Sequence, residues 1–328
     1  MLARRNFLRF ATALGLLSGA GIGCWSDSYA QPTKLGRIRI IAPGAAGGGF
    51  DETARSCEKA LVASGLIESA QIINIPGAGG TVGLVKFVEQ YRGRHDALLV
   101  SGSTMLSSII VNKTPIDFGA ATPLARLFGT ANAIVVPAAS RYKTIDDLVA
   151  VFKADPGSIS WAGGSIGGGD HMIAAMFAKT VGVDPKRLNY VAFAGGGEML
   201  ASVLGGHVTM ASSAWAEVSE QIRAGQLRCL GVTADKDEPG VDAPTLRSQG
   251  IDVAFYTWRA LLAAPRISNA ERANLLDVVA AMIGSPTWKA EAARQGWTDF
   301  YLAGDDFVKF VDGERQTART LLADLGLA

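Results

Sequence analysis

The chain has 328 residues, a length that favours two lobes over one small core. Apolar residues make up 48% of it and charged residues 19%, which excludes a disordered chain. The formal net charge is +1 and no basic run is interleaved with aromatic residues, so nothing indicates a nucleic-acid-binding surface. The 39 glycines cluster in loops that follow predicted strands, where the chain needs a permissive backbone.

Residues 1–30 have the pattern of an export signal. The segment ARRNFLRF carries paired arginines, an apolar stretch follows at residues 10–23, and Ser28-Tyr29-Ala30 offers small residues to a signal peptidase. The RRxFL pattern predicts the twin-arginine route and a periplasmic protein. The apolar stretch is short for a membrane anchor. Cys24 offers an alternative end to the signal, as the acylated cysteine of a lipoprotein, although the usual Leu three residues earlier is missing.

Residues 37–111 repeat the order strand, glycine-rich loop, helix three times, which is typical of parallel α/β architecture. Asp51 is predicted to be the N-cap of the first helix, with direct ligand contact as the alternative. The predicted strands are 37–42, 71–75 and 97–101, and the predicted helices are 51–64, the segment after the glycine turn of PGAGGTVGLVKFVEQY, and 105–111.

A crossing into a second doubly wound lobe is predicted at residues 133–136, and a return crossing at residues 253–262. We therefore expect a discontinuous domain 1 (31–132 and 258–328) and a domain 2 (133–257). The second lobe is predicted to contain strands 158–162, 189–193, 208–212 and 227–232 with helices 170–182, 199–204 and 216–224, and helices 269–283, 286–295 and 305–324 are predicted to follow the return crossing.

Four glycine-rich loops, 43–50, 101–104, 163–169 and 194–197, each lie between a predicted strand and helix and contain no Lys or Arg. Such a turn leaves backbone N–H groups unpaired at a helix N-terminus, where the helix dipole favours an anion. We expect the loops to meet around one small anionic ligand. The candidate binding residues are Ala45, Ala46, Gly47, Gly48, Phe50, Gly102, Ser103, Ser165, Ile166, Gly167, His171, Gly195, Gly196, Trp215 and Arg259.

Three of these side chains keep two interpretations. His171 either donates to the ligand or orients the loop before it, and Trp215 either binds ligand or packs between lobes. Arg259, the one cation near the predicted cleft, either binds the ligand or forms a salt bridge at the hinge.

Two motifs suggest other functions. Gly163 to Gly167 match the GxSxG nucleophile elbow, which would make Ser165 the nucleophile of a hydrolase, but only His171 and His207 follow. Gly77 to Gly83 resemble a dinucleotide fingerprint without the acidic residue that would hold a ribose. Cys57 and Cys229 lie among apolar neighbours without CxxC spacing and are predicted to be free and buried. We expect no catalytic residue, metal or cofactor.

In order along residues 37–327, the stretches APGAAGGGFDETAR, NIPGAGGTVGL, NYVAFAGGGEMLASVLGGHV, TWRALLAAP and GWTDFYLAGDDF resemble the periplasmic receptors of tripartite tricarboxylate transporters, the TctC or Bug family. The last three stretches look closer to the citrate-type members. Phe50 departs from those members, which often carry tryptophan there.

This resemblance implies a type II periplasmic binding fold, in which two doubly wound lobes joined by two crossing strands close around a carboxylate. It further implies a monomeric, non-enzymatic receptor that binds a di- or tricarboxylate through backbone N–H groups and water, and presents it to membrane permease subunits. A sensory receptor that presents its ligand to a membrane histidine kinase is the alternative function. Which carboxylate is bound does not follow from the motifs.

Overall fold

Ten strands form one continuous sheet in the computed structural model, which describes residues 32–193, 195–238 and 240–328. The strands follow the order β2-β1-β3-β9-β4-β7-β5-β6, and β8 and β10 each pair with β4. The strands are β1 (Leu35–Ala42), β2 (Ile67–Asn74), β3 (Ala97–Gly102), β4 (Thr122–Pro137), β5 (Ser160–Gly163), β6 (Asn189–Ala192), β7 (Met210–Ala214), β8 (Leu227–Val232), β9 (Tyr256–Ala263) and β10 (Leu302–Ala303).

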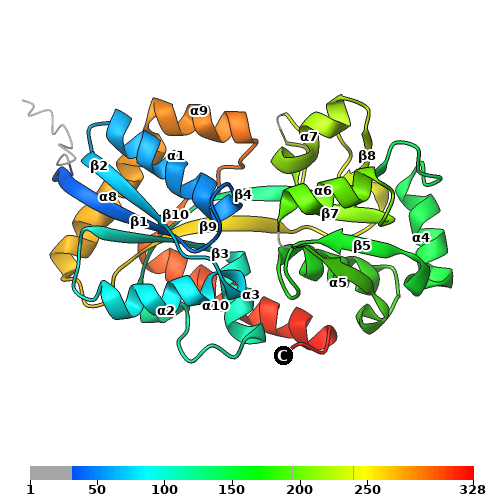
Figure 1. Cartoon of the computed structure of the whole chain (residues 1–328), viewed down its shortest axis with the longest axis horizontal. Coiled ribbons are helices and arrows are strands. Elements are labelled where there is room, and N and C mark those ends of the chain that lie inside the picture. Colours follow the sequence, from blue (N-terminus) through cyan, green and yellow to red (C-terminus); the bar gives the residue numbers. More distant parts are fainter. Residues whose placement is uncertain (1–31, 194, 239) are drawn as a thin grey trace, which may run out of the picture. The chain divides into compact units, whose positions relative to one another are not determined.

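Strands β4 and β9 join two groups of parallel strands (Figure 1). Strand β1 is parallel to β2 and β3, and β5 is parallel to β6 and β7. The first half of β4 pairs with β9, while its second half pairs with β7 and β8. Strands that join two groups of parallel strands are what the predicted type II periplasmic binding fold requires, and this fold class is confirmed.

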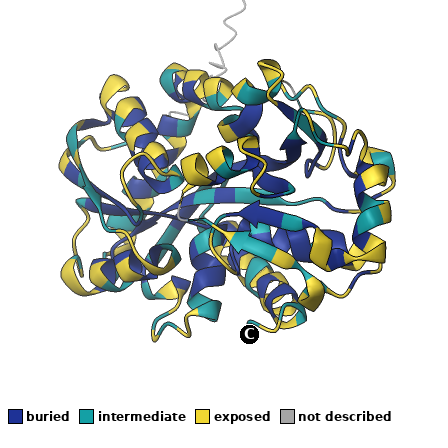
Figure 2. Ribbon diagram, turned by 45° about the vertical axis from the view of Figure 1, so that its right-hand side comes forward, coloured by how far each residue is buried: buried dark blue, intermediate teal, exposed yellow. Residues whose placement is uncertain are grey.

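Ten α-helices cover the sheet in the described residues (Figures 1 and 2). Their sequences explain several starts: the hydroxyl of Thr144 caps α4, that of Ser268 caps α8, and both sites are capping boxes. The helices are α1 (Gly49–Ala63), α2 (Thr81–Gln90), α3 (Ser103–Val111), α4 (Ile145–Ala154), α5 (Gly169–Thr180), α6 (Gly196–Leu204), α7 (Trp215–Arg223), α8 (Asn269–Gly284), α9 (Pro286–Gln295) and α10 (Gly304–Asp324).

The apolar core has separate clusters on the two sides of the crossing strands. One cluster draws its members from residues 38–128 and 258–311, and two others from residues 131–253. Every residue of β3 is buried, because helices cover both faces of a parallel strand. Figure 2 shows the buried residues concentrated in the sheet and on the inner faces of the helices. The expected domain boundaries within β4 and near β9 stay a prediction.

Several predicted element boundaries were wrong. Helix α1 begins at Gly49 and its N-cap is Gly48, so Asp51 lies in the first turn rather than at the cap. Strand β4 begins at Thr122, eleven residues before the predicted crossing, because its first half finds its partner in β9 more than 100 residues away. Helices α3 and α6 begin at Ser103 and Gly196, two and three residues before their predicted starts.

The described residues contain no helix long and apolar enough to cross a membrane. The predicted export signal, residues 1–30 with Cys24, lies outside them. Both predicted free cysteines are free, with Cys57 buried and Cys229 half-buried.

Candidate functional site

Five helices that follow strands have a glycine as N-cap and no capping side chain among the described residues, and four of them, α1, α3, α5 and α6, begin at the predicted glycine-rich loops. Their first N–H groups therefore lack both the intrahelical acceptor and the side-chain oxygen that α4 and α8 use. These amides are available to an anion, which the helix dipole also favours. The N-cap glycines are Gly48 for α1, Gly102 for α3, Gly168 for α5 and Gly195 for α6.

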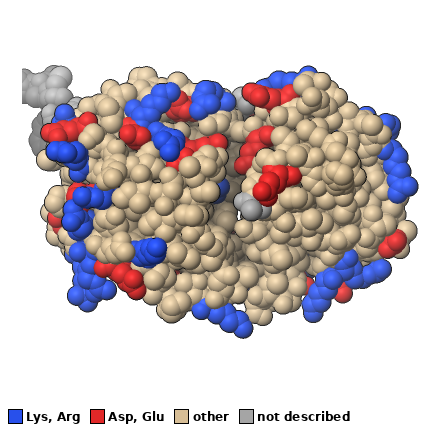
Figure 3. Space-filling view, in the orientation of Figure 1, with Lys and Arg blue, Asp and Glu red and all other residues tan. Residues whose placement is uncertain are grey.

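Three of these helix starts touch one face of β9. A Cβ at Gly49 would lie 2.9 Å from Arg259 Nη2, and one at Gly102 would lie 3.3 Å from Arg259 Cδ. On the other side of the crossing, a Cβ at Gly169 would lie 3.0 Å from Thr257 Oγ1. Thr257 and Arg259 point to the same face because side chains alternate along a strand. Glycine at these positions thus lets helix starts from both sides approach the crossing strand, beside the hollow that Figure 3 shows.

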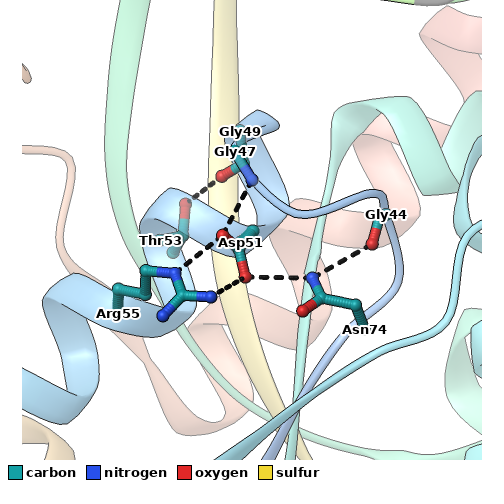
Figure 4. A network of polar contacts seen from close by, with 7 residues as sticks. All are labelled: Gly44, Gly47, Gly49, Asp51, Thr53, Arg55 and Asn74. Atoms are coloured by element: carbon teal, nitrogen blue, oxygen red, sulfur yellow. Dashed lines mark hydrogen bonds and ion pairs between the residues drawn. The ribbon is translucent and has the colours of Figure 1, made fainter.

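The first loop is held by the carboxylate of Asp51, whose side chain is almost fully buried (Figure 4). It accepts hydrogen bonds from Gly47 N (2.9 Å), Asn74 Nδ2 (2.9 Å) and Arg55 Nε (2.8 Å). Asn74 also donates to the carbonyl oxygen of Gly44 (3.2 Å), and Gly47 has a φ of 78°, which glycine adopts readily. Loop 43–49 therefore has a shape fixed by its own residues and by the end of β2.

The carboxylate of Asp170 holds loop 163–169 in the same way. Its carboxylate accepts from Gly164 N (2.9 Å) and from Asn132 Nδ2 of β4 (2.6 Å). Burial raises the pKa of Asp170 to about 7, and although the Gly164 bond lowers it, the charge of Glu217 acts with burial. On each side of the crossing strands, a glycine-rich loop is therefore hydrogen-bonded to an aspartate in the first turn of the helix that follows it.

His171 holds the loop through its ring. Its Nδ1 accepts from Gly167 N (3.0 Å), and the ring stacks on Tyr190 with centroids 4.1 Å apart. Burial lowers the pKa of His171 to about 4, so the imidazole is neutral at pH 7. This geometry agrees with the loop-orienting interpretation. Because Nδ1 is occupied by Gly167, it is not available to activate Ser165 as a nucleophile.

Arg259 supplies positive charge beside the starts of α1 and α3. Its guanidinium carbon lies 4.9 Å from the centre of the Phe50 ring, and no carboxylate of the described residues comes within 4 Å of the guanidinium. Burial lowers its pKa, while the charges of Glu217 and Glu52 act in the opposite direction. The expected hinge salt bridge is therefore not seen in the described part of the chain, and the side chain is positioned to pair with an anionic ligand.

The predicted site residues divide into three groups. Arg259, Phe50 and Gly102 meet at β9, while Trp215 is buried in the second lobe's core, with its Cδ1 3.5 Å from where a Cβ of Gly296 would stand. Three of the predicted amides bond within their own loops: Gly47 to Asp51, Gly48 to Ala45 O, and Gly167 to His171. The exposed members are Ala45, Ala46, Ser165, Ile166, Gly195 and Gly196, and Ser103 is buried.

Sequence reasoning missed the residues that shape the loops. Asn74 and Asn132 come from strands far along the chain, and no local signal connects them with Asp51 and Asp170. Gly49 and Gly169 belong to glycine runs, and their close approach to β9 depends on the crossing. The described residues contain no cluster of three or more His, Cys, Asp or Glu able to hold a metal ion.

The fold has two α/β lobes, and glycine-capped helix starts from both lobes face a crossing strand that the lobes share. This arrangement is that of a solute-binding protein. Residues 54–327 match the family of tripartite tricarboxylate transporter receptors, TctC, and the chain belongs to this family. Proteins of this family are periplasmic solute-binding receptors.

Relatives and solved structures agree with this assignment. The chain is 25% identical over 272 residues to protein BugT of Bordetella pertussis, covering 79% of each chain. A TctC solute-binding protein from Polaromonas is 25% identical and superimposes with a TM-score of 0.71, over 88% of this chain and 99% of that one. An adipate-bound protein from R. palustris has the same fold, with a TM-score of 0.79 and 19% identity over 89% of this chain and 97% of that one.

Proposed function

We propose that the protein is an exported, non-enzymatic and monomeric receptor that captures a small di- or tricarboxylate. The ligand lies between domain 1, residues 31–132 and 258–328, and domain 2, residues 133–257. The loaded receptor then delivers it to the membrane permease subunits of a tripartite transporter.

The observation that supports this most is the meeting of uncapped helix starts at one face of β9, beside an arginine without a carboxylate partner in the described residues. One carboxylate can accept from the open amides of Gly49 and Phe50 and pair with Arg259. A second can accept at the start of α5 or α6, on the other side of the crossing strands. A ligand that touches both lobes favours the closed state, because only its differential affinity can shift the equilibrium.

Backbone amides suit this task better than a cluster of arginines would. Oriented N–H groups bind an anion without a formal countercharge, and ordered waters can extend their reach to ligands of different length. Malate and adipate are bound by two proteins that share this fold, which makes dicarboxylates the first compounds to test.

Thermal unfolding against a panel of acids tests the proposal. The protein is first unfolded and refolded to remove any ligand that copurifies, and then melted with citrate, tricarballylate, malate, succinate or adipate. A ligand at 100 times its Kd should stabilise the native state by about 2.7 kcal/mol. The diamide of succinate is the matched control, because it keeps the shape and loses the charge. A panel in which no acid moves the melting temperature, or in which succinate and its diamide act alike, would contradict a carboxylate site.

We further propose that export uses the twin-arginine signal of residues 1–30, with cleavage after Ala30. Mass spectrometry of the periplasmic protein should find Gln31 at the N-terminus. An acylated Cys24 at the N-terminus would instead identify a lipoprotein.

A further inference from the structure

A cavity of about 260 Å³ lies on the face of β9 opposite to Arg259. Tyr256 and Trp258 line it, whereas Thr257 and Arg259 point to the glycine-capped helix starts. Helix α10 covers the cavity together with α3 from one side of the crossing and α5 from the other. The cavity is lined by Ser103, Leu106, Arg126, Met172, Met176, Ala254, Phe255, Tyr256, Trp258, Phe300, Phe310, Glu314, Thr317, Ala318 and Leu321.

Most of this lining is apolar, and its volume fits a small organic molecule. Methionine, leucine and phenylalanine side chains form much of the wall, with Met172 and Leu321 buried in a small cluster between α5 and α10. An apolar cavity of about 150 Å³ is enough to hold a benzene molecule. A space of about 260 Å³ can therefore hold one aromatic ring, or a short alkyl chain, together with a polar substituent.

One polar atom in the lining lacks a partner. Ser103 is 3% exposed, and its Oγ has no hydrogen-bond partner within the described part of the chain. Buried hydroxyl groups are nearly always bonded, so an unpaired one that lines a cavity indicates a missing acceptor or donor. A carboxylate at the glycine-capped helix starts would not pair with this hydroxyl, because the cavity lies on the opposite face of β9.

The charges in the cavity offset each other. Arg126 donates through Nε to the carbonyl oxygen of Phe300 (2.6 Å), and its guanidinium carbon lies 4.1 Å from the centre of the Phe310 ring. Glu314 accepts from Trp258 Nε1 (2.8 Å). Since one cation and one anion already face the space, a further ionised group would leave a net charge in apolar surroundings.

We propose that this cavity, the hinge cavity, binds a small neutral amphiphile, one aromatic ring or a short alkyl chain carrying a hydroxyl group. The hydroxyl accepts from Ser103 or Arg126 and donates to Glu314, while the apolar body contacts the methionines and phenylalanines. This ligand class differs from the carboxylates of the proposed function, and the two sites lie on opposite faces of β9. Because α5 and α3 both line the cavity, its occupant contacts both sides of the crossing.

Calorimetric titration of the purified protein with phenol tests the proposal. We expect saturable binding of one phenol per chain, which is retained when the main site is saturated with a carboxylate. Benzoate, which carries a charge on the same ring, should bind in the hinge cavity at least tenfold more weakly than phenol. Displacement of phenol by a carboxylate ligand would overturn a second site, and equal binding of benzoate would overturn the neutral ligand class.

Variants of α10 locate the site. Ala318 is buried in the lining, so Ala318→Leu fills the cavity and should weaken phenol binding at least tenfold. Ala323 is exposed on the same helix, and Ala323→Leu should bind phenol as the wild type does. If Ala318→Leu does not fold, Ala254→Leu fills the space from the loop before β9. Phenol binding that survives whichever filling variant folds would place the ligand elsewhere and overturn the proposal.

Discussion

Replacing Asp51 by alanine removes the carboxylate that fixes the first glycine loop (Figure 4). Two of its bonds come from Gly47 N and Asn74 Nδ2, both at 2.9 Å. A hydrogen bond to a charged group contributes about 1.5–3 kcal/mol. Gly47 is exposed, so water can replace its acceptor in the variant. We therefore expect a total loss of about 2–3 kcal/mol in the free energy of unfolding, most of it from the Asn74 bond.

Thermal and urea unfolding measure this loss. For a chain of this length, about 2–3 kcal/mol corresponds to a melting temperature lower by about 5 °C. Affinity for the carboxylate should fall about tenfold or more, because the loop must then be ordered by the ligand. Arg55→Ala is the matched control, since Arg55 bonds the same carboxylate from an exposed position and its loss should change little. If Asp51→Ala melted and bound like Arg55→Ala, the loop would not depend on this carboxylate.

The pH dependence gives a second check on Asp51. Burial raises its pKa, but the hydrogen bonds from Arg55, Gly47 and Asn74 more than offset burial, so the pKa lies below its ordinary value. A carboxyl group with a lowered pKa stabilises the fold above its unfolded pKa, about 3.9, and loses this effect as the pH falls through the folded value. The difference between Asp51→Ala and the wild type should be full at neutral pH and shrink below about pH 4.

Four further predictions concern charge and close approach. Arg259→Met should weaken carboxylate binding about 10- to 100-fold by removing a charged hydrogen bond. It should also stabilise the empty protein, because burial disfavours the guanidinium charge, which has no carboxylate partner within 4 Å in the described residues; a destabilised variant that still binds would reverse this interpretation. Gly49→Ala should displace the Arg259 guanidinium and weaken binding with little effect on melting. Alanine at exposed Gly36 of β1, where a Cβ meets nothing within 4 Å, should be neutral, and equal effects of the two variants would refute the close approach. Because the pKa of Asp170 is raised to about 7, its stabilising effect is present below about pH 4 and is lost as the pH rises through 7. Asp170→Asn should therefore melt at a higher temperature than the wild type at about pH 8 and lose this advantage toward about pH 4. A difference in melting temperature that does not depend on pH would be inconsistent with this titration. The pKa of His171 is lowered to about 4, so its effect on stability has the opposite dependence on pH and is lost as the pH falls. His171→Gln should therefore lose less stability than the wild type between pH 6.5 and 4. Equal losses in the two proteins would contradict this prediction.

The architecture could be predicted because its signals are local. Apolar strands, glycine turns and amphipathic helices alternate in a fixed order, and the pattern restarts after Pro137. The starts of β4 and β9 could not be placed, because pairing between strands more than 100 residues apart decides them. Pro123 and Gly129 lie inside β4, whose pairing with β9 shifts register after Pro123 and before Phe128.

The site was only partly predictable for the same reason. The glycine loops and Arg259 are visible as residues, but which N–H groups remain free depends on side chains that enter from elsewhere. Asp51 satisfies Gly47, and His171 satisfies Gly167, so the loops present the first amides of their helices rather than every glycine. The position of Phe50 beneath the Arg259 guanidinium likewise follows from the crossing of β9 and not from the sequence near residue 50.

An experimental structure of the protein with the acid that stabilises it most would test the proposed function most directly. We predict one carboxylate of the ligand within hydrogen-bond distance of the Gly49 and Phe50 amides and of the Arg259 guanidinium, and its other end at the start of α5 or α6. A ligand bound away from Arg259, or held by one lobe alone, would contradict the proposed carboxylate site between the lobes.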